Sequence, residues 1–101
     1  LVEVSGCTGV DAAGVVVGDG DPAEQTRQAI RNIAAALAQA GATLEQVIRT
    51  RVFCTDITGW EEIGRAHGEV FGEIRPVTTM VEVSSLIDPA MLVEIEADAL
   101  I

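Results

Sequence analysis

The sequence predicts an α+β fold in which two helices pack on one face of a mixed β-sheet. The predicted elements follow the order hairpin, helix, strand, helix, strand, strand. Segments rich in β-branched residues outnumber the helical segments. Each helical segment carries its apolar residues along one stripe, which a sheet has to cover. In addition, 49% of the 101 residues are hydrophobic, which is enough for one core, so we expect a single domain over residues 1–101.

The N-terminal segment is predicted to form a hairpin. Leu1–Val4 alternates weakly between apolar and polar residues, Asp11–Gly14 has the composition of a turn, and Val15–Val17 would return as the second strand. The chain begins inside the first of these strands. We therefore expect that a preceding segment is missing from it.

A helix is predicted to follow this hairpin. Asp21 is a residue type preferred at an N-cap, Pro22 suits the first helical position, Glu24 suits the first turn, and Gly41 marks the end. The residues of its apolar stripe recur at steps of three and four, which is the helical period. They are Ile30, Ile33, Ala34, Leu37 and Ala40.

A long strand and a second helix are predicted next. Thr43–Gln46 resembles a one-turn cap, and Val47–Ile57 is β-rich with alternating faces. Thr58–Glu61 has the pattern of a capping box, and the helix that it opens would end near Gly72. One strand face would carry Arg49, Arg51, Phe53 and Thr55, facing solvent or an acidic neighbour, and the other Ile48, Val52 and Cys54. The helical stripe comprises Trp60, Ile63, Val70, Phe71 and His67, for which we favour a core or edge position over a catalytic one.

Two further strands are predicted at the C-terminus. Val77–Ser84 and Met91–Ala99 are separated by an Asp88–Pro89 turn, and we expect the two to pair antiparallel and to line a small-molecule site. Alternation of faces predicts that the apolar face of each lies under the helices. These apolar faces consist of Val77, Thr79, Val81 and Val83 in the first strand, and of Val93, Ile95 and Ala97 in the second. The opposite faces carry Thr78, Met80, Glu82, Leu92, Glu94 and Glu96.

Charge and composition exclude several classes of protein. The formal net charge is −10 and the chain has six arginines but no lysine, so a basic surface for nucleic acid is not expected. No apolar run is long enough to span a bilayer and no signal peptide is evident, which favours a cytoplasmic protein. A single histidine and two cysteines without ligand spacing argue against a metal site, and we expect Cys7 and Cys54 to be reduced.

Three segments of the chain resemble the Rid (YjgF-like) family, also described as endoribonuclease L-PSP. They are VEVSGCTGVDAAG, AEQTRQAIRNIAAALAQAGATLEQVIRTRVFCTDI, and the pair RPVTTMVEVSSL and LVEIEADA. The resemblance implies a chorismate mutase-like fold, a homotrimer with a central barrel, and clefts between subunits. The family's N-terminal strand, with a tyrosine near the site, has no counterpart here.

The implied activity is hydrolysis of reactive enamines and imines to carbonyl compounds and ammonia, as in 2-iminobutanoate/2-iminopropanoate deaminases, without metal or cofactor. By resemblance, Glu94 positions the attacking water, and Ser5 and Gly6 line the cleft with backbone. Thr78, with Met80 on the same strand face, stands where the family's deaminases have a carboxylate-binding arginine. The further substrate-binding candidate is Arg75, just before that strand.

The absence of that arginine leaves alternatives open. A hydroxyl cannot replace a guanidinium fork, so the cleft is predicted to prefer a neutral or cationic imine. Alternatively Arg51, Arg65 or Arg75 reaches the cleft from another direction. The second hypothesis is a trimer that binds a small metabolite without turnover, and the third, which the charge disfavours, is an endoribonuclease or translation inhibitor.

Overall fold

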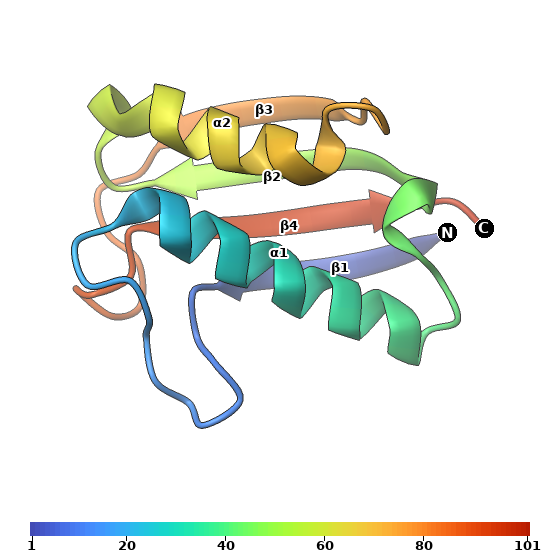
Figure 1. Ribbon diagram of the computed structural model, residues 1–101, viewed down its shortest axis with the longest axis horizontal. Coiled ribbons are helices and arrows are strands. Elements are labelled where there is room, and N and C mark those ends of the chain that lie inside the picture. The colour runs from blue at the N-terminus through green and yellow to red at the C-terminus, as the bar shows by residue number, and fades with distance from the viewer.

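The computed structural model describes residues 1–101 and shows two helices on a mixed four-stranded sheet (Figure 1). The strand order is β1-β4-β2-β3, in which β4 pairs antiparallel with both β1 and β2, and β3 pairs parallel with β2. The elements are β1 (Val2–Thr8), α1 (Pro22–Gln39), β2 (Val47–Cys54), α2 (Trp60–Phe71), β3 (Val77–Glu82) and β4 (Val93–Ala99), with short 3₁₀ turns at Leu44–Gln46 and Ile57–Gly59. The predicted α+β class is confirmed.

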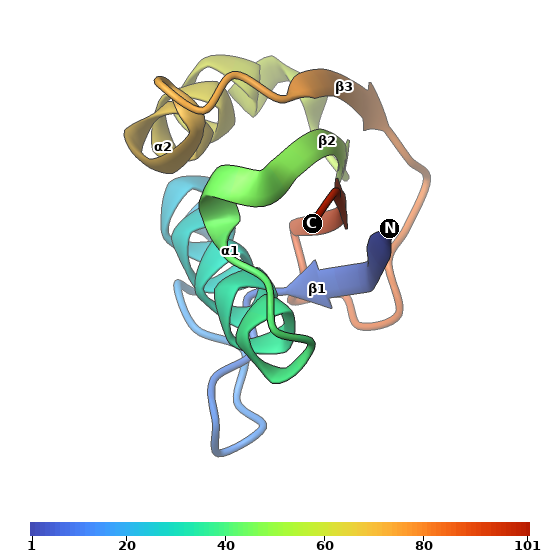
Figure 2. The same cartoon turned by 90° about the vertical axis from the view of Figure 1, so that its right-hand side faces the viewer.

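Both helices lie on the same side of the sheet, and the other side carries no helix (Figure 2). We call these two sides the helix face and the open face. The core fills the space between the helices and the helix face, as the apolar stripes predict, but two members of these stripes lie outside it: Trp60 is 56% exposed and Ala40 is exposed. Its fully buried members include Ile30, Ile33 and Leu37 of α1, Ile63 of α2, and Val52, Val93, Ile95 and Ala97 of the sheet.

Helix α1 begins and ends as its sequence predicts. The Asp21 carboxylate accepts a hydrogen bond from the backbone N–H of Glu24 at 3.1 Å, which satisfies one of the free donors of the first turn. Gly41 adopts a φ of 77° beyond the last turn, a conformation that glycine adopts without strain. Arg27 then links α1 to α2 through a 2.9 Å contact with Glu69.

The capping box predicted at Thr58–Glu61 does not form. Helix α2 begins at Trp60, and its N-cap Gly59 makes no side-chain hydrogen bond. The Thr58 hydroxyl instead donates to Asp56 at 2.6 Å, and the Asp56 carboxylate caps the preceding 3₁₀ turn. The side-chain cap therefore lies at the 3₁₀ turn, and α2 itself begins without one.

The N-terminal hairpin prediction is wrong. Strand β1 pairs with β4, and the segment expected to return along β1 forms only an isolated bridge between Val10 and Val16. Asn32 of α1 holds the start of this loop by donating to the carbonyl groups of Thr8 and Val10 at 2.9 and 2.8 Å. The turn residues were recognised correctly, but the partner strand lies about ninety residues away along the chain, which no local pattern reveals.

The C-terminal strands do not pair with each other, contrary to the prediction. Strand β2 lies between them, and β3 forms the edge of the sheet. The faces of β4 are as predicted, with Val93, Ile95 and Ala97 fully buried. The faces of β3 are reversed: Val77, Thr79 and Val81 lie opposite Arg49, Arg51 and Phe53 on the open face, with Val77 56% and Val81 42% exposed.

Strand β2 departs from its predicted faces at one residue. Ile48 was expected to share the buried face of Val52 and Cys54 but is 45% exposed. A register shift between Val47 and Arg49 against β4 turns Val47 inward in its place. Such a bulge changes which residues of a strand face the core.

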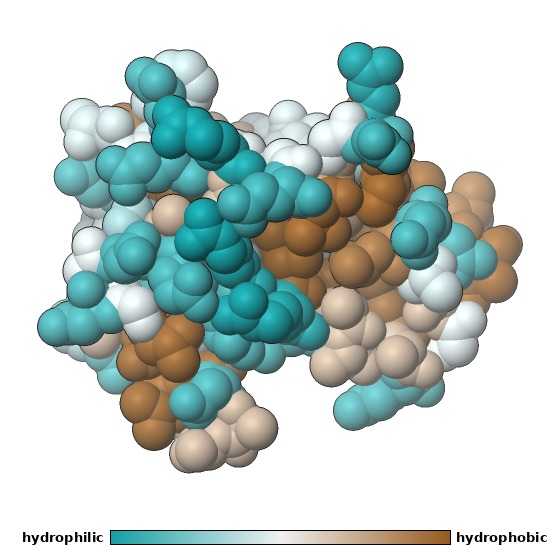
Figure 3. Space-filling model, in the orientation of Figure 1, coloured by the Kyte–Doolittle hydropathy of each residue, from teal (hydrophilic) through white to brown (hydrophobic).

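The surface of the helix side is mixed in polarity (Figure 3). Hydrophilic side chains cover much of it, while apolar surface shows between the C-terminal parts of the two helices. The partly buried Leu44, Val70 and Ile74 pack on the core in this part of the chain. Neither helix combines the length and the apolar content that crossing a bilayer requires.

Candidate functional site

Glu94 lies on the open face, where β4 passes between β1 and β2. Its neighbours across the strands are Thr8 and Phe53, and its side chain extends over Gly6. A Cβ atom at Gly6 would stand 2.7 Å from Cδ of Glu94, closer than real side-chain atoms approach each other. The register of β1 shifts between Val4 and Cys7, so the carboxylate lies directly on the irregular backbone that contains Ser5 and Gly6.

The charge of this carboxylate affects the pKa of the half-buried Cys7. Burial raises the pKa of its thiol, and the negative charge of Glu94 raises that pKa further. The Cys7 thiol lies 3.5 Å from the Ser5 carbonyl group, to which it donates a weak hydrogen bond. The thiol is therefore held in its neutral form beside the glutamate.

An ion-pair cluster occupies the remainder of the acidic part of the open face. Arg51 contacts Glu96 at 3.3 Å and Asp98 at 3.5 Å across the β2–β4 ladder. A hollow of about 290 Å³ lies beside these residues, and its lining includes Ser5 and Glu3 of β1. Since two carboxylates already contact its guanidinium, Arg51 is not free to bind an anionic ligand. The sequence prediction that Arg51 faces solvent or an acidic neighbour agrees with this pairing.

Thr78 lies on the helix face, in a chain of polar contacts that passes through the protein interior. His67 of α2 lies with Nε2 2.9 Å from the Thr50 hydroxyl, and the Thr50 hydroxyl lies 2.8 Å from that of Thr78. The Thr78 hydroxyl also donates to the Pro76 carbonyl group at 3.3 Å. Thr50 is fully buried, whereas Thr78 is exposed.

Met80 and Arg75 occupy different surroundings. Met80 follows Thr78 on the helix face and packs against the core, so most of its side chain serves packing. Arg75 has a left-handed φ of 58°, and its backbone N–H donates to the Phe71 carbonyl group at 2.9 Å, which closes the end of α2. Neither Arg65 nor Arg75 forms an ion pair.

The candidate site residues thus form two groups on opposite faces of the sheet. Glu94, Ser5 and Gly6 belong to the open face, and Thr78 and Met80 belong to the helix face. Between them lies strand β2 with its buried residues. One copy of the chain therefore does not bring Thr78 and Glu94 into a common site.

Comparison with known proteins identifies the family. The family profile described as Endoribonuclease L-PSP matches residues 1–101. The chain belongs to this family. The crystal structure of Rv2704 from Mycobacterium tuberculosis, described as a member of the YjgF/YER057c/UK114 family, superimposes with a TM-score of 0.89 at 56% identity, covering 98% of this chain and 77% of that one. The resemblance to the Rid (YjgF-like) family is confirmed.

Two curated relatives in the L-PSP family bear on the length and function of the chain. An uncharacterized protein of Streptomyces coelicolor, SCO2049, is 42% identical over 84% of this chain, which spans 63% of that relative. The 3-aminoacrylate deaminase RutC of Acinetobacter baylyi is 35% identical over 98% of this chain and 78% of its own length. One relative of this chain is therefore described as a 3-aminoacrylate deaminase.

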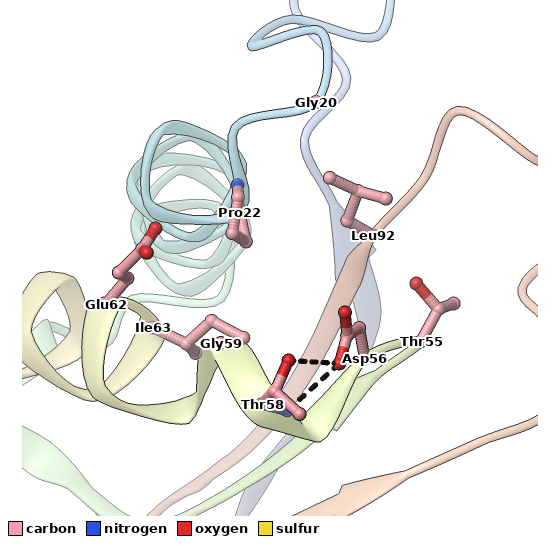
Figure 4. A pocket seen from close by; sticks show the side chains of 9 residues that line it. All are labelled: Gly20, Pro22, Thr55, Asp56, Thr58, Gly59, Glu62, Ile63 and Leu92. Atoms are coloured by element: carbon pink, nitrogen blue, oxygen red, sulfur yellow. Dashed lines mark hydrogen bonds between the residues drawn. The ribbon is translucent and has the colours of Figure 1, made fainter.

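One surface cavity, whose lining includes Asp56 and Thr58, contains none of the L-PSP site candidates. It has a volume of about 420 Å³ and lies where the N-terminal ends of α1 and α2 meet the ends of β2 and β4 (Figure 4). Its carboxylate Asp56 accepts hydrogen bonds from the hydroxyl and the N–H of Thr58, and these bonds lower the Asp56 pKa. That carboxylate is engaged in holding the turn.

The sequence interpretation missed the contact between His67 and Thr50. A signal was present, because Thr50 shares the inward parity of Val52 and Cys54, and His67 lies one helical turn from Ile63 and Phe71. Two polar residues on buried faces predict a mutual hydrogen bond once the helix is known to cover that strand. The sequence does not show that α2 packs over β2, and the structure does.

The position of Glu94 can be tested through Cys7. Glu94→Gln removes the charge that raises the Cys7 pKa, so the thiolate fraction at pH 8 increases and alkylation by iodoacetamide becomes faster. Burial, the larger cause of the raised pKa, remains. We expect an acceleration of a few fold, less than the roughly tenfold that a full pKa unit would give.

Two controls accompany this measurement. Glu96→Gln changes a carboxylate on the same face, paired with Arg51, and should leave the Cys7 rate unchanged. Cys54, which is fully buried, serves as the internal reference in each variant. Equal Cys7 rates in the wild type and in Glu94→Gln would contradict the placement of the carboxylate beside Cys7.

Proposed function

We propose that this protein hydrolyses reactive enamines or imines to carbonyl compounds and ammonia, in clefts between the subunits of a homotrimer. The observation that carries the proposal is the Glu94 carboxylate, held over the bare backbone at Gly6. Because Gly6 has no side chain, the Glu94 carboxylate lies close against the backbone of β1, and a small planar substrate beside this carboxylate would meet backbone groups of β1. The description of the relative RutC as a 3-aminoacrylate deaminase supports the same class of reaction.

The chemistry needs one group that accepts a proton and returns it. Water attacks the carbon of the C=N bond: as the C–O bond forms, the π electrons of C=N move to nitrogen, and Glu94 accepts one proton of the water and returns it to that nitrogen, which gives a neutral carbinolamine. The carbinolamine then collapses: its hydroxyl proton passes through Glu94 to the nitrogen, the C–N bond breaks, and the carbonyl compound and ammonia leave. An enamine enters this sequence after protonation at carbon converts it to the imine. Glu94 is half-buried, which leaves it open to water while limiting its mobility.

A shared cleft follows from the division of the candidate residues between two faces. A second copy of the chain could bring its Thr78 to the Glu94 of the first, which no rearrangement within one sheet achieves. The open face also leaves apolar residues uncovered, with Val77 56% and Val81 42% exposed. Exposed apolar surface of this kind favours burial between subunits of a symmetric assembly.

The preference for substrate charge follows from the arginines. Arg51 is paired with Glu96 and Asp98, and Thr78 offers only a hydroxyl. With a net charge of −10, the protein disfavours an anionic ligand unless a specific cation holds it. We therefore assign an uncharged or cationic imine as the preferred substrate.

A second candidate function is metabolite binding without turnover. It is favoured by the same lack of an arginine fork, since a weakly held substrate would be converted slowly. Cleavage of RNA, which the family description names, is disfavoured because the chain has no lysine and its six arginines include three in ion pairs with acidic side chains.

The role of Glu94 is tested by Glu94→Gln with 3-aminoacrylate and its uncharged amide, 3-aminoacrylamide, as substrates. The amide side chain keeps the shape but cannot accept the proton, so kcat/KM for ammonia release should fall by about 10²–10⁴-fold. Glu96→Gln is the matched control and should retain most of the activity. If Glu94→Gln hydrolyses both compounds as fast as the wild type, the proposed mechanism is wrong; binding without any hydrolysis by the wild type would support the metabolite-binding alternative.

The role of position 78 is tested by adding the missing cation. Thr78 is exposed, so Thr78→Arg should fold and should bind the carboxylate of 3-aminoacrylate. A charge-assisted contact of about 1.5–3 kcal/mol corresponds to a roughly ten- to hundredfold gain in kcat/KM for this substrate. The amide should gain little, and Thr78→Gln, which has a long side chain without the charge, should show no such gain for 3-aminoacrylate.

The assembly is tested by static light scattering at micromolar concentration, where we expect the mass of a trimer. A monomer with full activity would rule out the shared cleft.

A further inference from the structure

Three polar side chains connect the interior of the protein to the edge strand β3. His67 of α2, Thr50 of β2 and Thr78 of β3 form a continuous chain of short contacts, 2.9 Å from Nε2 to the first hydroxyl and 2.8 Å between the hydroxyls. Thr50 is fully buried, His67 is half-buried and Thr78 is exposed. The chain therefore runs from a half-buried imidazole through a fully buried hydroxyl to an exposed hydroxyl at the protein surface.

The directions of the hydrogen bonds in this chain depend on the tautomer of His67 and on which hydroxyl donates. We assign the single hydroxyl proton of Thr78 to the Pro76 carbonyl oxygen, which can only accept. With this assignment Thr78 accepts from Thr50, Thr50 accepts from Nε2 of His67, and every donor in the chain points outward.

The outermost bond of the chain is the weakest. The Thr78 hydroxyl lies 3.3 Å from the Pro76 carbonyl oxygen, well beyond the usual 2.7–2.8 Å for hydroxyl donors. A ligand atom that accepts a hydrogen bond could replace this carbonyl by a rotation of the hydroxyl alone. The 2.8 Å bond from Thr50 would stay in place during that change.

We propose that Thr78 is the contact that selects the substrate, and that His67 and Thr50 are positioning residues that hold its hydroxyl as an outward donor. The ligand group that fits is an uncharged acceptor, a carbonyl oxygen or an imine nitrogen. The inference rests on the proposed function for placing Thr78 in the cleft. It adds a specificity determinant and assigns a role to His67.

The neutral state of His67 agrees with this arrangement. Burial lowers the pKa of the imidazole, so at pH 7 the ring carries one proton, and the outward direction of the chain requires this proton on Nε2. This relay, by which we mean the chain from His67 through Thr50 to Thr78, is neutral and supplies a hydrogen-bond donor without a positive charge. It can therefore serve a neutral acceptor, while it lacks the attraction for carboxylates that a guanidinium provides.

The test uses pyruvate and pyruvamide, two ligands of the same shape that differ in charge. Titration followed by NMR should show tighter binding of pyruvamide to the wild type. Thr78→Val should weaken pyruvamide binding about two- to tenfold, the range for a single neutral hydrogen bond. Thr79→Val removes a hydroxyl from the other face of β3 and is the matched control, with unchanged affinity expected.

A spectroscopic readout separates positioning from a merely structural role. His67 is the only histidine, so ¹⁵N-histidine labelling gives the signals of this one ring. We expect the Nε2–H tautomer in the free protein, and a shift of the Nε2 signals when pyruvamide binds, although the ligand does not touch His67. Thr50→Val should abolish that ligand-induced shift and weaken pyruvamide binding as Thr78→Val does.

Two variants at position 67 test whether the hydrogen-bond donor of His67 is needed for the preference for pyruvamide. His67→Gln places an amide near the position of Nε2 and should retain part of the preference for pyruvamide, while His67→Phe keeps a ring without the donor and should lose it. Circular dichroism establishes that each variant is folded. Should Thr50→Val not fold, Thr78→Val at its exposed position still decides the outcome.

The outcomes distinguish this inference from the proposed function. A Nδ1–H tautomer in the free protein, an unchanged His67 signal on pyruvamide binding, or equal affinity in Thr78→Val would each overturn the relay, even if the protein hydrolyses enamines. So would a failure of the wild type to bind pyruvamide. Conversely, a responsive His67 in a protein that hydrolyses neither 3-aminoacrylate nor its amide would support the relay and contradict the hydrolase.

Discussion

The alternation of strand β4 is the constraint on which the rest of the structure depends. β4 has a partner on each side, and every second residue, from Val93 to Ala99, is fully buried under the helices. A slip of one residue would expose this whole set and bury three carboxylates. The cost of such a slip fixes Glu94 on the open face, so the core itself determines where the candidate catalytic group lies.

Gly6 and Arg51 make this placement of Glu94 possible, one by its size and the other by its charge. Gly6 leaves room for the carboxylate where any side chain would overlap it, and Arg51 offsets Glu96 and Asp98 further along the strand. Without Arg51, three carboxylates would stand on one face of β4 with only Arg49, which lies opposite Asp98 in the β2–β4 register, to offset them. Of these three carboxylates, Glu94 is the one that pairs with no arginine.

Sequence patterns predicted the parts of this fold that burial on one face determines. The helices, the cap at Asp21 and the faces of β4 could be predicted because each has one clearly apolar side. β3 could not, because an edge strand is exposed on both faces and its valines lie on the open side. The sequence did not predict which strands pair either, because the parallel pairing of β3 with β2 depends on how α2 crosses over the sheet. The same crossing brings His67 to Thr50, which is why that contact was not foreseen.

The buried contact between His67 and Thr50 is not required by the fold. An apolar residue of the same shape at each position would fill the layer between α2 and the sheet, and replacing both partners of a buried hydrogen bond in this way is often neutral or stabilising. Valine would satisfy the strand at position 50 as well as threonine does. The polar pair leads to one exposed atom, the Thr78 hydroxyl, on the edge strand of the sheet. The explanation for a polar chain that packing does not need therefore lies at its exposed end, where its direction determines what the hydroxyl can bind.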